Sequence, residues 1–168
     1  MSELTISGVT ISVSVQIQQL ISEFAYRIDL MGGDTVAELF AEDGYYEADG
    51  KRSTGRKAIR EAYELRSARG PRQSRHLFTN LRVVGTDGST YCATTIMLLF
   101  ARDGYGIHAA EPLLVADIED VYQMDQNGEI VIKSRRLTTV FADPAHQPIL
   151  PLGHEIDSSE VIGESAFE

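Results

Sequence analysis

The second half of the chain changes from a helical to an alternating pattern of apolar residues, and this change constrains the fold most. Four strand-like runs cover about residues 73–85, 89–102, 111–124 and 129–142. The turns between them contain Asp87-Gly88, Asp103-Gly104 and Asn127-Gly128. Glycine in such pairs accepts the positive φ that tight hairpins need. The sequence therefore predicts a meander of long antiparallel strands.

The first half of the chain shows helical spacing. Apolar residues recur at steps of three and four between Ile17 and Leu30, where Ser12 or Ser14 is the expected N-cap and Gly32-Gly33 the expected end. Asp34 is expected to cap a short second helix, and a third helix is expected from Arg56 to about Arg69. Residues 45–48 read as a short strand. Helices followed by a strand meander indicate an α+β fold, with a curved antiparallel sheet wrapped around the N-terminal helices and an apolar pocket between them.

The length of 168 residues fits one folded domain with short extensions. We expect an N-terminal arm in residues 1–14, either a short strand or a flexible segment, and a domain in residues 15–142. Residues 143–168 form an acidic tail in which prolines interrupt any periodicity. This tail is expected to be either disordered or folded against a neighbour.

Composition and charge argue against several classes of function. The net charge of -10 argues against a nucleic-acid partner. The chain has no apolar run of about 18 residues and no basic, apolar leader at its start, so we expect a cytoplasmic protein with no membrane partner. The single cysteine, Cys92, rules out a disulfide framework and is expected to be a small core residue. We see no phosphate loop, dinucleotide motif or histidine pair at ligand spacing, so neither a cofactor nor a metal is expected.

His76 and Asp29 are the candidate acid/base pair. His76 lies in an extended run after a basic loop, and histidine is the side chain that titrates nearest to neutral pH. Asp29 lies among apolar residues near the end of the first helix, where burial of a carboxylate requires a partner. A carboxylate bound to one ring nitrogen fixes the tautomer and raises the basicity of the other. The alternatives are a core histidine and a surface carboxylate.

Further polar and aromatic residues are candidates for the same site. Alternation along the last strand sends one of Arg135 and Arg136 inward, where a guanidinium can hold a developing oxyanion or a leaving group. The alternative is that both arginines lie on a solvated edge. Without a bulge, Phe78 and Asn80 share the face of His76, and Leu77 lies on the opposite face with Leu81 and Val83. The remaining candidates are two tyrosines as hydroxyl donors and one aromatic residue of the first helix: Tyr26, Tyr46 and Phe24.

In this order and spacing, several short motifs resemble the SnoaL-like branch of the NTF2-like superfamily. The similarity covers about residues 15–142. Its parts are Tyr26-Arg27-Ile28-Asp29 with Gly33-Asp34, Leu39-Phe40-Ala41-Glu42-Asp43-Gly44, Gly55-Arg56-Lys57-Ala58-Ile59, Arg75-His76 with Asn80, and Arg135-Arg136. One departure is Ile130, which stands where many members have tryptophan.

The resemblance implies a cone-shaped α+β fold and an acid/base function. Similar members include scytalone dehydratase, hexachlorocyclohexane dehydrochlorinase, bile-acid dehydratase and steroid isomerases. In the dehydratase-like members an Asp–His dyad removes a proton, which maps onto Asp29 and His76. The family's pocket arginine maps onto Arg135, or Arg136 if the register shifts, and its helix tyrosine onto Tyr26.

We therefore expect a cofactor-independent lyase that acts on a hydrophobic aromatic or alicyclic small molecule. The eliminated group is water, halide or a small carbonyl fragment such as formaldehyde. The alternatives are a proton-shuttling isomerase and a non-catalytic binding or assembly subunit, because the family contains both. The strand at 89–102 carries apolar residues on both faces. We therefore also expect a homodimer or homotrimer.

Overall fold

In this computed structural model, the structure describes residues 5–6 and 8–143. The expected acidic tail lies outside the described residues from position 144 onward. The elements in chain order are β1 (Thr5–Ile6), β2 (Val9–Thr10), α1 (Ile11–Met31), the 3-10 helix η1 (Val36–Leu39), β3 (Phe40–Ala48), β4 (Lys51–Thr54), α2 (Gly55–Ser67), β5 (Arg72–Gly85), β6 (Thr90–Asp103), β7 (Leu114–Met124) and β8 (Ile130–Ala142).

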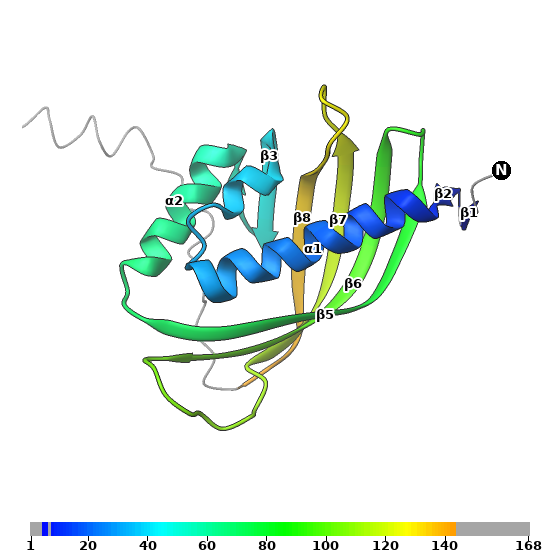
Figure 1. The fold of residues 1–168 in the computed structure, drawn as a ribbon. Helices are drawn as coiled ribbons and strands as arrows, with labels where there is room; N and C mark the ends of the chain where they lie inside the picture. Colours follow the sequence, from blue (N-terminus) through cyan, green and yellow to red (C-terminus); the bar gives the residue numbers. More distant parts are fainter. Residues whose placement is uncertain (1–4, 7, 144–168) are drawn as a thin grey trace, which may run out of the picture.

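One curved six-stranded sheet forms the frame of the molecule, in the order β4-β3-β8-β7-β6-β5. The four long strands lie close to the predicted runs, which confirms the meander. We had expected a wholly antiparallel sheet. The sheet is mixed instead, because β3 pairs with β8 in parallel. In Figure 1, α1 crosses one face of the sheet and α2 lies beside β3 at one end. The α+β fold with helices on one face is therefore confirmed.

The first helix begins earlier than the sequence indicated. Thr10 has extended backbone angles and its hydroxyl accepts a hydrogen bond from the Val13 N–H at 3.4 Å, so Thr10 is the N-cap rather than Ser12 or Ser14. The helix ends at Gly32, whose φ of 76° is left-handed. The expected second helix is a short 3-10 turn that follows Thr35, so Asp34 is not its cap.

A bulge in β5 changes which residues face inward. Asn80 has a φ of 56°, and the pairing of β5 with β6 shifts between Thr79 and Arg82. Beyond the bulge, Leu81 and Val83 pack against the core, whereas Leu77 on the other side of the bulge is exposed. The expectation that Leu77 shares a face with Leu81 and Val83 is therefore wrong.

The core lies between α1 and the inner face of the sheet. Ile17, Ile21 and Phe24 of α1 are buried, as are Ile118 of β7 and Ile132 of β8. Burial of each such side chain stabilises the fold by about 1.5–3 kcal/mol. The core therefore fixes the position of α1, whose C-terminal end carries Asp29.

Cys92 corrects another expectation. It is exposed, because it lies on the outer face of β6 between the buried residues Tyr91 and Ala93. The alternation of a strand gives every second residue to the outer face, and Cys92 occupies one of those positions.

Candidate functional site

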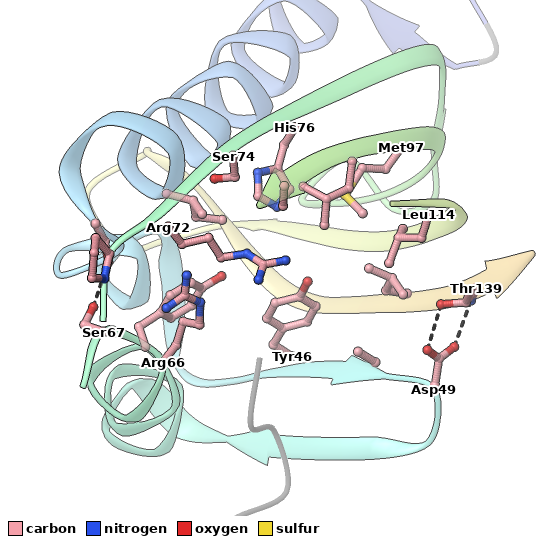
Figure 2. Close-up of a pocket in the computed structure, with 18 of the residues that line it drawn as sticks. Tyr46, Asp49, Arg66, Ser67, Arg72, Ser74, His76, Met97, Leu114 and Thr139 are labelled. Atoms are coloured by element: carbon pink, nitrogen blue, oxygen red, sulfur yellow. Dashed lines mark hydrogen bonds between the residues drawn. The ribbon is translucent and has the colours of Figure 1, made fainter. Parts of the chain in front are cut away.

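A cavity of about 790 Å³ opens between the two helices and the concave face of the sheet. Its apolar wall comes from the strands and includes Met97, Leu99, Leu114 and Leu137. Its polar and charged lining includes Tyr46, Asp49, Lys51, Tyr63, Arg66, Arg72, Ser74 and His76. Figure 2 shows several of these side chains around the cavity. An apolar cavity with a few convergent polar groups is the usual form of a small-molecule site.

Asp29 and His76 meet at the wall of this cavity. His76 Nδ1 lies 2.6 Å from Asp29 Oδ1, and the backbone N–H of His76 donates to Asp29 Oδ2 at 2.7 Å. The hydroxyl of Ser74 donates to Oδ1 at 2.6 Å. The side chains of His76 and Asp29 are only 13% and 7% exposed. The contact between α1 and β5 therefore brings together two residues that the sequence had paired.

The environment keeps Asp29 ionised. Burial opposes the charge, but the hydrogen bonds and charge of His76, together with the Ser74 hydroxyl, outweigh burial and hold the pKa of Asp29 below its usual value. An ionised carboxylate only accepts hydrogen bonds, so Nδ1 of His76 carries the proton. When the imidazole is neutral, Nε2 is then left with a free lone pair. Among the residues that the structure describes, none forms a hydrogen bond with Nε2, and His76 lines the cavity.

Two tyrosines provide hydroxyl groups to the same cavity. Tyr46 of β3 and Tyr63 of α2 both line it and are largely buried. Burial raises the pKa of Tyr46 to about 12, and burial also raises the pKa of Tyr63 well above its usual value. Both hydroxyls therefore stay protonated and can donate hydrogen bonds. Gly33 makes room for Tyr63, because a Cβ at Gly33 would lie 2.5 Å from the Tyr63 ring.

Arg135 faces inward and Arg136 outward, as alternation predicted, but Arg135 is not a cavity residue. Its Nε and Nη2 donate to the two carboxylate oxygens of Asp120 at 2.9 and 2.7 Å, and both side chains are 1% exposed. The Tyr122 hydroxyl also donates to Asp120, at 2.6 Å. The Arg135 guanidinium stacks 4.0 Å from the centroid of the Phe24 ring. The expected role of Arg135 as an oxyanion holder in the cavity is therefore not supported by its position.

The other expected site residues do not line the large cavity. Tyr26 is 50% exposed and Arg136 forms surface ion pairs with two glutamates, so neither lines the cavity. Phe24 and Phe78 pack edge to face beside Arg135. Asn80, at the bulge, borders a smaller cavity of about 240 Å³ together with Phe78. Of the nine expected residues, His76 and Tyr46 line the large cavity, and Asp29 contacts it only through His76.

Sequence reasoning missed Ser74, Arg66 and Arg72. Alternation along β5 contains the signal for two of them, because Ser74 and Arg72 precede His76 by two and four positions and share its face. Arg66 comes from the last turn of α2 and has no such local signal. In the described part of the chain, no group of three or more His, Cys, Asp or Glu residues is arranged to hold a metal ion. No helix there is both long and apolar enough to span a bilayer.

The SnoaL-like domain family model matches residues 10–136. The chain therefore belongs to the SnoaL-like family, which confirms the resemblance. No curated protein sequence matches the chain.

Solved structures share the fold at low sequence identity. A proposed scytalone dehydratase from Novosphingobium aromaticivorans is 20% identical with a TM-score of 0.70, covering 82% of this chain and 91% of that one. ActVI-ORFA from Streptomyces coelicolor is 19% identical with a TM-score of 0.68, covering 76% and 98%. An NTF2-like protein with a cystatin-like fold, also from N. aromaticivorans, is 20% identical with a TM-score of 0.63, covering 80% and 86%. The fold is therefore NTF2-like.

Proposed function

We propose that this protein is a cofactor-independent lyase that eliminates water, halide or a small carbonyl fragment such as formaldehyde from a hydrophobic aromatic or alicyclic molecule. The observation that carries the proposal is the Asp29–His76 hydrogen bond, which leaves Nε2 of His76 as a free base at the wall of an apolar cavity. Membership of the SnoaL-like family and the likeness to a proposed scytalone dehydratase support it.

The dyad accounts for each proton in such an elimination. In water loss, Nε2 of His76 takes a proton from a carbon next to an electron-withdrawing group. The electron pair of the broken C–H bond then forms the new C=C double bond. The C–O bond breaks, and the imidazolium returns its proton to the departing oxygen. In formaldehyde loss the proton comes from a CH₂OH hydroxyl, a C–C bond breaks and the remaining carbanion is protonated. Asp29 stabilises the imidazolium in both cases.

The tyrosines fit a supporting role. A carbonyl oxygen next to the reacting carbon gains negative charge as the proton leaves. Tyr46 and Tyr63 line the cavity as protonated hydroxyls and can donate hydrogen bonds to that oxygen. They take the place that the sequence had given to Arg135 and Tyr26.

A panel of substrates tests the proposal. The purified protein and its His76→Asn variant are incubated in D₂O with β-hydroxy ketones, β-halo ketones and arylpropane diols, and the products are followed by mass spectrometry. We expect loss of water, hydrogen halide or formaldehyde with the wild type, and a rate about 10³-fold lower with His76→Asn. Equal rates for the two proteins contradict the proposal. Deuterium uptake without loss of mass identifies the isomerase instead.

We also propose that a second copy of the chain covers the outer face of the sheet. Leu77, Leu98, Val115 and Phe141 are paired in register across β5, β6, β7 and β8 and form an apolar row. Leu77 and Phe141 are 48% and 68% exposed. Light scattering at micromolar concentration should give a dimer or trimer, and Leu98→Asp should shift it towards monomer. A wild-type monomer contradicts this proposal.

A further inference from the structure

The large cavity carries a charge opposite to that of the whole protein. The chain has a net charge of -10, yet three cationic side chains line the cavity, Lys51, Arg66 and Arg72, against one carboxylate, Asp49. Asp49 is already engaged, because its oxygens accept the backbone N–H and the hydroxyl of Thr139 at 2.8 and 2.7 Å. The lining is therefore positive within an acidic protein, which favours an anionic ligand.

Two of these cations lie together at one end of the cavity. Arg66 belongs to the last turn of α2, and Arg72 is the first residue of β5. Burial lowers the pKa of Arg66, and the positive charge of Arg72 lowers it further, so the two guanidinium groups are close enough to repel each other. Figure 2 shows both side chains on the same side of the cavity, facing Met97 and Leu114 across it.

The charge of this arginine pair is only partly balanced. Arg72 Nη1 donates to Asp103 at 2.8 Å, but Asp103 is 82% exposed and Arg72 only 16%. Arg72 Nε is buried with no partner in the described part of the chain. Arg66 Nη1 donates to the Gly70 carbonyl at 3.3 Å, and no carboxylate among residues 8–143 forms an ion pair with Arg66. Only Arg72 of the two therefore has a carboxylate partner, and that carboxylate is exposed.

We propose that Arg66 and Arg72 bind a carboxylate at one end of the substrate, while its apolar rings contact Met97, Leu99 and Leu114. Guanidinium forks match the planar carboxylate and give paired, charge-assisted hydrogen bonds. This inference rests on the proposed function, because it names the substrate class of the same cavity.

The spacing along β5 fits this substrate. Arg72 and His76 lie four residues apart on one face of the strand, so their Cα atoms are about 13 Å apart at about 3.3 Å per residue. The side chains extend into the same cavity. One or two aromatic rings fill the distance between a carboxylate held by the arginines and a carbon next to His76. The substrate class is therefore an aromatic carboxylate whose reacting carbon lies at the far end from the acid group.

Binding of matched probes tests this inference apart from catalysis. The dissociation constants of 2-naphthoate and its neutral analogue 2-naphthamide are measured by calorimetry, with 2-naphthalenesulfonate as a third probe. The proteins are the wild type, Arg66→Met, Arg72→Met, and the His76→Asn variant. Arg60→Met is the control. Arg60 is an exposed residue of α2, the helix that carries Arg66, and its substitution changes the net charge by the same amount as Arg66→Met.

We expect 2-naphthoate to bind the wild type at least about tenfold more tightly than the amide. Arg66→Met and Arg72→Met should each remove most of this preference, while Arg60→Met and His76→Asn keep it. High salt should weaken carboxylate binding to the wild type, a readout that needs no variant.

Equal binding of the carboxylate and the amide overturns the inference, as does failure of either to bind at millimolar concentration. Binding of the sulfonate but not the carboxylate overturns the assignment to carboxylates. A preference that survives in the Arg66→Met/Arg72→Met double variant, shown to be folded by circular dichroism, overturns the role of the arginines. Because the preference is also measured in His76→Asn, failure of the lyase proposal leaves this result unchanged.

Discussion

Two largely buried aspartates, Asp29 and Asp120, each hold a basic partner, and only one of these two partners lines the large cavity. Asp29 binds one nitrogen of His76, and the other nitrogen belongs to a ring that lines the cavity. Asp120 binds Arg135 through both of its oxygens and takes a third hydrogen bond from Tyr122. The ring of Phe24 packs against one face of the Arg135 guanidinium.

The difference separates a chemical role from a structural one. A neutral imidazole can gain and lose a proton near neutral pH, whereas a guanidinium cannot be deprotonated in a protein. Burial opposes the charge of Arg135, but Asp120 outweighs it and keeps the pKa of Arg135 above its usual value. The Asp120–Arg135 pair therefore stabilises a charge inside the core, whereas in the proposed function the Asp29–His76 pair prepares a base.

Asp29→Asn should have the largest effect on activity, because it removes the carboxylate that orients His76. The amide can accept from Nδ1–H or donate to Nδ1, so the tautomer of His76 is no longer fixed. We expect turnover to fall by about 10³-fold or more while the protein stays folded. Steady-state kinetics and thermal unfolding measure the two effects. Retained turnover in a folded Asp29→Asn protein would show that Asp29 does not orient the base.

Arg135→Met should instead lower the stability of the fold. It leaves Asp120 as a buried charge without its cation, and we expect a loss of about 3–5 kcal/mol in the free energy of unfolding. The double variant Asp120→Leu/Arg135→Met removes both charges and should be more stable than either single variant. Urea denaturation checks this order. If the double variant is the least stable of the three, the pair does more than neutralise buried charge.

The pH dependence of stability should also test the ionised state of Asp29. The folded-state pKa of Asp29 lies below the unfolded value of about 3.8, so its ionised form stabilises the fold above that pH. This contribution is lost as the pH falls through the lowered pKa. The stability difference between the wild type and Asp29→Asn should therefore narrow in acid, as the pH falls through the lowered pKa of Asp29. A gap that widens as the pH falls contradicts the assigned direction.

The smallest effects should come from two residues that the sequence placed in the site and the structure does not. Tyr26 is half-exposed, and Arg136 pairs with Glu47 and Glu119 at the surface. Tyr26→Phe and Arg136→Gln should each change kcat/KM by less than about twofold. A tenfold loss in either variant would extend the site beyond the cavity described above.

The parts of the fold that follow from local chemistry were predictable. The long strands lie where Asp-Gly and Asn-Gly turns bound alternating residues, and the first helix ends at Gly32 as expected. The contact of Asp29 with His76 was also expected, because a buried carboxylate needs a partner and the family resemblance named one.

Other features depend on register and could not be read from local sequence. Asn80 adopts a positive φ although it is not glycine, and the resulting bulge reverses the inward face of β5. Asp120 reaches Arg135 only because β7 and β8 align these two positions, and this pairing changes Arg135 from a site residue to a core residue. Arg66 joins Arg72 through the turn between α2 and β5, which no periodicity specifies.

The most direct test of the central claim is the protonation state of the two ring nitrogens of His76. Nitrogen NMR of ¹⁵N-histidine-labelled protein at mildly alkaline pH distinguishes a protonated from an unprotonated ring nitrogen, and His76→Asn assigns the signals. The Asp29 contact predicts that Nδ1 is protonated and Nε2 is not, and that Asp29→Asn weakens this preference. A dominant Nε2–H tautomer in the wild type would contradict the claim that His76 offers a free base to the cavity.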